Sequence, residues 1–152
     1  MPDNVVDGLG DDPVVQFSVF LENKVGRLSE FTRLLANNSI HLMAMTVLDT
    51  TDSSIVRIVV DDPDQAASVL FLEGYSFTHT LVLAVELNAA EDVPSMLSCI
   101  LAAEINVNYL YPFIVRPADR SALVMHLEDL DLAADVLQAN QFTVLCQSDI
   151  SR

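Results

Sequence analysis

The sequence contains no tryptophan, a single lysine, four glycines and two cysteines among its 152 residues. Seven basic residues stand against 22 acidic ones, which gives a formal net charge of -15. Nucleic-acid binding requires clustered Lys and Arg to neutralise phosphates, and an anionic membrane surface repels an acidic chain. The charge balance therefore argues against nucleic acid and membranes as partners and favours a soluble protein.

Long apolar runs are also missing, since no stretch reaches the roughly 18 residues of a membrane span. The N-terminus is acidic and turn-rich and has no signal-peptide pattern, so we expect residues 1–12 to form a flexible tail and the protein to be cytoplasmic. Cys99 and Cys146 fit no metal or redox spacing, and buried free thiols are the expected reading. No cofactor or metal is predicted.

Half of the chain is hydrophobic, and its apolar pattern repeats. A shift of 65 residues superimposes four apolar positions of the first half on four of the second: Leu28, Phe31, Leu35 and Ile40 on Val93, Met96, Ile100 and Ile105. The chain is therefore interpreted as two copies of one unit, residues 13–79 and 80–152.

In the first copy, β-rich and helical patterns alternate. Strands are predicted over 14–22, 40–49 and 54–60, with a fourth beginning at 75–79, and helices over 25–37 and from Asp62-Pro63 to about 73. Asp62 is expected to be the N-cap of the second helix and Gly74 to end it. The acidic pairs Asp61-Asp62 and Glu128-Asp129 lie at matching helix starts, and capping is expected to explain both.

The second copy repeats this order. Strands are predicted over 80–87, 105–115, 121–128 and 142–148, and helices over 92–103 and 129–140. Each copy is then a β-α-β-β-α-β unit, an α+β ferredoxin-like arrangement with two helices on one face of an antiparallel sheet. Both faces of the strand at 40–49 are apolar, so we expect the units to pack together and the chain to form a homodimer.

The stretch LENKVGRLSEF, residues 21–31, joins the first strand to the first helix. The first amide groups of a helix have no internal partner and lie at the positive end of its dipole, which favours an anion. Gly26 allows close approach to the backbone, and Asn23 offers amide groups. The junction fits a small anion or zwitterion, although a glycine before a helix also serves simply as a turn.

Together with the β-α-β-β-α-β order, the N-x-x-G-R-L motif (Asn23, Gly26, Arg27, Leu28) and the following N-x-I-x-L start of the second strand resemble ACT domains over about residues 14–148. The resemblance implies a small tandem ACT protein that binds a free amino acid and regulates an enzyme of amino-acid metabolism. In such proteins the ligand usually lies between paired domains, held by the loop after the first strand and by the second strand of the neighbour.

By this resemblance the ligand-binding residues fall in two groups. The loop group comprises Asn23, Lys24, Val25, Gly26, Arg27 and Leu28, and the facing wall comprises Asn108, Tyr109, Leu110 and Tyr111. The tyrosines could equally be an aromatic pair of a packed strand. The corresponding second loop carries Glu91 where the first has Gly26, so one working site per chain is expected. The alternative is that the second loop binds a cation.

Two other functions are compatible with the sequence. A constitutive regulatory subunit without a ligand would need Gly26 only for its turn, and a small hydrolase of the acylphosphatase type would use Arg27 and Asn23. No nucleophile, nucleotide or zinc motif appears, so enzyme activity is not expected. His41 is interpreted as a ligand contact or as a satisfied, partly buried histidine.

Overall fold

The computed structural model describes residues 10–151, so residues 1–9 of the predicted tail lie outside the described part. The helices and strands follow one another in this order: β1 Val14–Glu22, α1 Arg27–Asn37, β2 Leu42–Asp49, β3 Ser53–Val60, α2 Pro63–Leu72, β4 Ser76–Leu87, α3 Asp92–Ala102, β5 Val107–Pro112, a 3-10 turn Pro117–Asp119, β6 Ser121–Leu127, α4 Leu130–Ala139, β7 Val144–Leu145 and α5 Gln147–Ile150.

The strands form one antiparallel sheet in the order β2-β3-β1-β4-β6-β5, with β7 paired to β4. Strand β4 belongs to both halves: Ser76 to Val82 pair with β1, and Leu83 to Leu87 pair with β6. The two strands expected at 75–79 and 80–87 are thus one continuous strand, because no turn-forming residue interrupts it. The division of the chain at 79/80 falls inside this strand.

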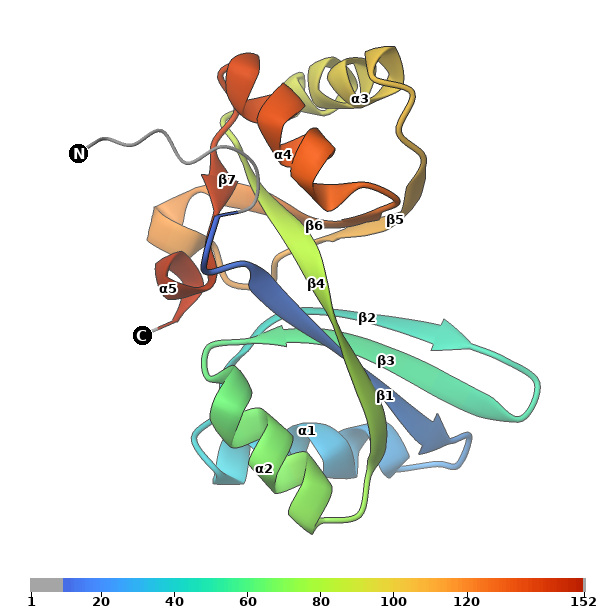
Figure 1. Cartoon of the computed structure of the whole chain (residues 1–152). Coiled ribbons are helices and arrows are strands. Elements are labelled where there is room, and N and C mark those ends of the chain that lie inside the picture. The colour runs from blue at the N-terminus through green and yellow to red at the C-terminus, as the bar shows by residue number, and fades with distance from the viewer. Residues whose placement is uncertain (1–9, 152) are drawn as a thin grey trace.

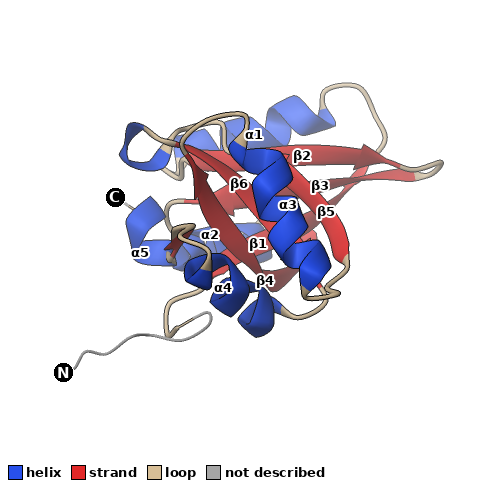
Figure 2. Cartoon of the chain, turned by 90° about the horizontal axis from the view of Figure 1, so that it is seen from above, coloured by secondary structure: helices blue, strands red, loops and turns tan. Residues whose placement is uncertain are grey.

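The sheet curls so that its halves lie face to face, with helices on the two outer sides (Figure 1). Helices α1 and α2 cover the outer face of the first half through Phe31, Leu35 and Leu70, which are fully buried. Helices α3 and α4 cover the second half (Figure 2), with Met96 and Leu137 in their core. The predicted α+β ferredoxin-like fold, with two helices on one face of each unit, is confirmed.

A third core lies between the two halves of the sheet. It contains small and aromatic side chains, among them Ala44, Val59, Val124 and Phe113. An isolated bridge joins Ala44 of β2 to Phe113, the residue directly after β5. The expectation that both sheet faces would be covered is therefore met within one chain, although only over part of the first half.

Some element boundaries differ from the expectation. Strand β5 ends at Pro112, and the strand expected over 142–148 is reduced to Val144–Leu145. The chain then turns into α5, where Asp149 Oδ2 accepts the amide of the N-cap residue Cys146 at 2.8 Å. Asp62 and Asp129 are the N-caps of α2 and α4, as expected, and they accept the amides of Gln65 and Leu132.

Candidate functional site

The loop between β1 and α1 is held by backbone geometry and by charges. Gly26 is the N-cap of α1 and has a φ of 88°, a left-handed conformation that favours glycine. No side chain caps the helix there, and a Cβ built on Gly26 would meet nothing within 4 Å. The space beside Gly26 is thus open, and the left-handed backbone accounts for the glycine whether or not a ligand binds.

The basic residues of this loop are already paired. Arg27 Nη2 donates to Glu22 Oε1 at 2.7 Å, and its Nη1 donates to Glu30 Oε1 at 3.2 Å. Lys24 Nζ lies 3.2 Å from Glu22 Oε2. Lys24, followed by Arg27, holds the pKa of Glu22 below its ordinary value. The two cations, Lys24 and Arg27, are balanced by Glu22 and Glu30. Any positive potential for an anion at this loop therefore comes mainly from the amides at the N-terminus of α1, which no side chain caps.

The remaining loop residues are exposed. Val25 is fully exposed, Leu28 is 38% exposed, and Asn23 Nδ2 donates to Asp49 Oδ1 at the end of β2. Two hollows border the start of α1, of ≈ 540 Å³ and ≈ 460 Å³; Glu30, Glu73 and Tyr75 line both. Burial raises the pKa of the Tyr75 hydroxyl, with Glu30 adding to the effect.

The wall residues lie elsewhere in the fold, on β5 between the two halves. Gln16, which is fully buried on β1, donates from Nε2 to the Tyr109 hydroxyl at 2.7 Å and accepts from the Tyr111 hydroxyl at 2.6 Å. Burial also raises the pKa of Tyr111 well above its usual range. The two tyrosines therefore tie the second unit to the first, and their rings are stacked 6.4 Å apart.

The Tyr109 ring is also in contact with a cationic side chain, Arg57, and with the ring of His126. The Arg57 guanidinium lies 3.9 Å from the Tyr109 ring centre, and the His126 ring stacks on Tyr109 at 4.9 Å. Asn108 Nδ2 lies 2.8 Å from His126 Nδ1. Burial, and to a lesser degree Arg57, lowers the pKa of His126. The last wall residue, Leu110, is 38% exposed.

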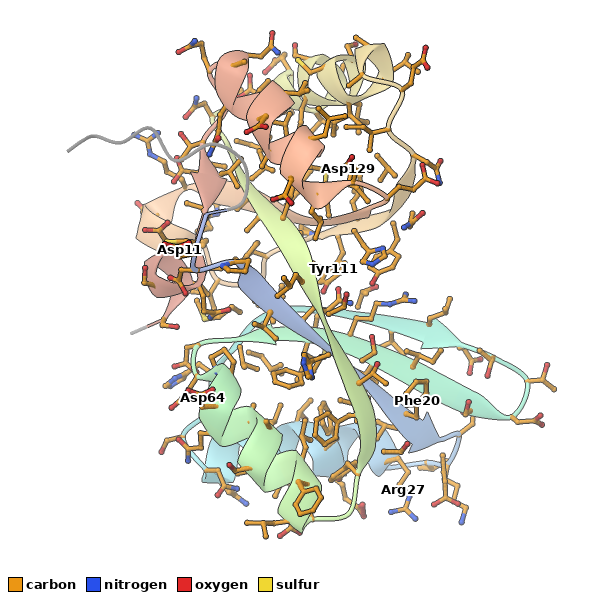
Figure 3. The ribbon with its side chains drawn as sticks, viewed as in Figure 1. Asp11, Phe20, Arg27, Asp64, Tyr111 and Asp129 are labelled. Atoms are coloured by element: carbon orange, nitrogen blue, oxygen red, sulfur yellow. The ribbon has the colours of Figure 1, made fainter. Side chains whose placement is uncertain are left out.

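Within one chain the structure does not bring the loop and the wall together. Gln16, which the tyrosines contact, precedes Asn23 by seven residues of extended chain, or about 23 Å. Figure 3 shows Tyr111 between the two halves and Arg27 at the far end of the first. Among residues 10–151 no hydrogen bond, ion pair or ring contact joins the two groups.

The second loop differs from the first in a way that goes beyond Glu91. Asp92 Oδ2 accepts the backbone amides of Asn88 and Ala89, at 2.8 and 3.1 Å. Asn88 Oδ1 also accepts from Arg120 Nη1. A carboxylate of the chain itself therefore stands at the start of α3 and satisfies two amides of the preceding loop, although α3, like α1, has no side-chain cap.

The contacts of Gln16, Arg57 and His126 were not predicted from the sequence. Gln16 stands in a β-rich run where its amide has no distinguishing spacing, and only the folded chain shows that it is buried. His41 lies beside a hollow of ≈ 700 Å³ with Nδ1 2.6 Å from Asp61 Oδ2, so it has a partner as expected, but its side chain is 63% exposed rather than partly buried. Asp61 thus holds His41, and the capping role expected of this aspartate belongs to Asp62 alone.

Three further findings concern the described residues. No group of three or more His, Cys, Asp or Glu side chains is arranged to hold a metal ion. No helix is long and apolar enough to cross a membrane. Cys99 and Cys146 are free and half-buried rather than fully buried.

The fold is shared with solved structures. Protein BT0572 from Bacteroides thetaiotaomicron is 28% identical with a TM-score of 0.83, covering 92% of this chain and 96% of that one. The regulatory subunit of aspartate kinase from Thermus thermophilus is 12% identical with a TM-score of 0.60, covering 85% and 93%. The corresponding subunit from Thermus flavus is 16% identical with a TM-score of 0.53, covering 90% and 99%.

No curated protein sequence matches the chain significantly. A family described as "ACT domain pair" matches residues 13–152, nearly the whole chain. The match agrees with the two ferredoxin-like halves and with the expectation from the N-x-x-G-R-L motif. The chain therefore belongs to the ACT domain pair family.

Proposed function

We propose that the protein binds a free amino acid at the β1–α1 loop and that binding alters its contact with an enzyme of amino-acid metabolism. ACT domain pairs are typical of amino-acid-sensing regulatory proteins. Two structural neighbours are regulatory subunits of aspartate kinase, which supports a regulatory rather than a catalytic role. Binding can shift a regulatory equilibrium only through different affinities for its two states.

The contrast between the two loops carries this proposal. Neither α1 nor α3 has a side-chain cap, but Asp92 places a carboxylate at the start of α3 that accepts the Asn88 and Ala89 amides, whereas the equivalent position of the first loop carries the cation Arg27. Buried or partly buried amides are normally satisfied, and an open helix N-terminus attracts a carboxylate. We therefore assign the ligand's carboxylate to the first turn of α1 and expect one ligand per chain.

The ligand's amino group requires acceptors, which the same loop offers. Asn23 uses its Nδ2 to donate to Asp49, which leaves its Oδ1 to accept from an ammonium group. Arg27 retains guanidinium donors beyond its bonds to Glu22 and Glu30. In the proposal, Lys24, Val25 and Leu28 complete the loop side, and Asn108, Tyr109, Leu110 and Tyr111 of a second chain form the facing wall.

Two substitutions of Gly26 test the assignment with matched backbone demands. Asn and Asp both tolerate a positive φ, but only Asp adds a negative charge beside the uncapped amides. Gly26→Asp is expected to abolish amino-acid binding in calorimetry, while Gly26→Asn keeps measurable affinity. Equal affinities in the two variants would remove the loop from the site.

The φ of 88° at Gly26 also favours a second candidate function, because it explains the glycine without any ligand. In that case the chain is a constitutive regulatory subunit of an amino-acid biosynthetic enzyme. Its partner would then be captured equally well from extracts with and without added amino acids. An amino-acid-dependent capture excludes this second candidate.

A further inference from the structure

One face of the first half of the sheet is only partly covered. The residues on this face follow from the strand register: Thr46, Arg57, Ser18 and Thr78 form one row across the sheet, and Leu48, Ile55, Phe20 and Ser76 form the next. Glu22, paired with Ser53, lies one row further along. We call these three rows the open face.

The open face continues a surface that is buried elsewhere in the chain. The same side of the sheet carries Ala44 and Val59, which pack against the second half of the sheet. Beyond Arg57 this cover ends, and Phe20 and Leu48 are 40% and 46% exposed. Figure 1 shows the β2–β3 hairpin and the end of β1 extending past β5 and β6. The row that contains Phe20 and Leu48 is thus exposed at the edge of the interface between the two halves of the sheet.

Charge distinguishes the open face from the rest of the protein. The chain has a net charge of -15. The three rows of the open face, by contrast, contain one cation, Arg57, and one carboxylate, Glu22, so their charges cancel. A neutral face is where two copies of such an acidic chain approach at the lowest electrostatic cost.

Arg57 has no partner of opposite charge among residues 10–151. It stacks on Tyr109, and its Nε–H is buried without a hydrogen-bond acceptor. Glu22 accepts from Arg27 and Lys24, but its side chain stays 60% exposed and a carboxylate has about four acceptor sites. Each copy therefore holds an unpaired cation and a carboxylate with spare capacity on the same face.

The positions of these two residues are related by a simple symmetry. Arg57 pairs with Ser18, two residues before Phe20, and Glu22 comes two residues after Phe20. The Phe20–Ile55 pair lies midway between them. A two-fold axis passing over this pair, in the plane between two stacked open faces and perpendicular to the line from Arg57 to Glu22, lays Arg57 of each copy over Glu22 of the other.

We propose that a second copy of this chain covers the open face, with the Phe20–Ile55 row at the centre and reciprocal Arg57–Glu22 ion pairs on either side. The contact is isologous, so every interaction occurs twice. It buries the exposed apolar row and extends the internal sheet-to-sheet interface across the two-fold axis.

This arrangement also joins the separated parts of the proposed site, a step that rests on the proposed function. Arg57 touches the Tyr109 ring, so Glu22 of the second copy, placed at Arg57, lies beside the β5 wall. Glu22 directly precedes the Asn23–Leu28 loop. One chain then supplies the loop and the other supplies Asn108 and Tyr109, and each dimer holds two equivalent sites.

The mass of the full chain in solution, without any amino acid, tests the interface independently of ligand binding. Light scattering after size exclusion should give twice the chain mass of 16.7 kDa at micromolar concentration. Phe20→Glu should shift the protein to the monomer mass. The control Phe71→Glu, at a side chain 76% exposed on α2, should leave the dimer intact. Circular dichroism and melting confirm that both variants fold.

Charge reversal tests the predicted pairing even if Phe20→Glu fails to fold. Arg57→Glu and Glu22→Arg alone should each weaken the dimer by about tenfold, because a surface pair of modest strength is lost twice. The double variant Arg57→Glu/Glu22→Arg should recover most of the affinity. A monomeric wild-type protein overturns the proposal, as does a dimer that is insensitive to Phe20→Glu and to both reversals, which would use another face such as the β2 edge.

The two proposals fail separately. A dimer that responds to the charge swap but binds no amino acid supports the interface and rejects the sensor. Amino-acid binding by a wild-type monomer rejects the interface and leaves the loop assignment standing.

Discussion

Tyr111→Phe should destabilise the protein through one buried hydrogen bond. The Tyr111 side chain is 4% exposed, and its hydroxyl donates to Oε1 of the fully buried Gln16 at 2.6 Å. Phenylalanine preserves the ring but leaves the Gln16 oxygen without that donor. An orphaned buried acceptor costs about 1–3 kcal/mol. A cost of about 2 kcal/mol lowers the melting temperature of a 150-residue domain by about 4 to 8 °C.

Thermal unfolding followed by circular dichroism measures this shift. Tyr75→Phe is the matched control, because its ring packs on Phe31 while no hydrogen bond of its hydroxyl is found among the described residues. The control should stay within about 0.5 kcal/mol of wild type. If both variants melt within a degree of wild type, the Gln16 network does not hold the two halves together as argued.

Three other perturbations follow from the structure. Asp62→Ala removes the cap that accepts the Gln65 amide and should cost about 1 kcal/mol in urea unfolding, whereas an unchanged midpoint would deny the cap any stabilising effect. Asp92→Ala frees the amides of Asn88 and Ala89 and should likewise lower stability by about 1 kcal/mol, and a more stable variant would contradict the assignment of Asp92 as the carboxylate that satisfies them. His126→Phe keeps the stack on Tyr109 but cannot titrate. Burial and Arg57 lower the pKa of His126 in the fold, so unfolding takes up a proton and wild-type stability falls as the pH drops below the ordinary value of 6.5. The His126→Phe variant should lose the part of the pH dependence that comes from His126. Identical slopes of melting temperature against pH for both proteins would contradict the lowered pKa of His126.

The sequence predicted the local elements well because each has a local cause. Amphipathic spacing placed Phe31 and Leu35 on one face of α1, and the Asp62-Pro63 pair marked the start of α2. The repeat of apolar positions indicated two units. These signals depend on residues that are close in sequence, so they can be recognised without knowledge of the tertiary structure.

The misjudged elements also had signals, but weaker ones. Residues 75–87 contain no turn residue, which is consistent with one strand, yet the repeat suggested a break at 79/80. Pro112 ends β5, and the Cys146-to-Asp149 cap turns the chain into α5. The strands expected over 105–115 and 142–148 were predicted from β-rich composition. A proline ends the first of them and a helix cap ends the second, and these local features outweigh composition.

The two groups of candidate site residues could be named from the sequence, but their relative positions in the fold could not. The open loop around Gly26 agrees with the motif, but the position of Tyr109 and Tyr111 is set by Gln16, 93 and 95 residues away in sequence. No spacing rule reports such a contact. The separation of loop and wall within one chain is therefore a tertiary result, and it leads directly to the role proposed for a second copy.

The most direct test of amino-acid sensing is thermal unfolding of the protein against each of the twenty amino acids at millimolar concentration, followed by calorimetry of any hit. Ligand that binds only the native state adds about 2.7 kcal/mol at a hundredfold excess over Kd. We predict a raised melting temperature with one or two amino acids, one ligand per chain, and loss of the shift in Gly26→Asp. A flat response to all twenty would contradict the sensor.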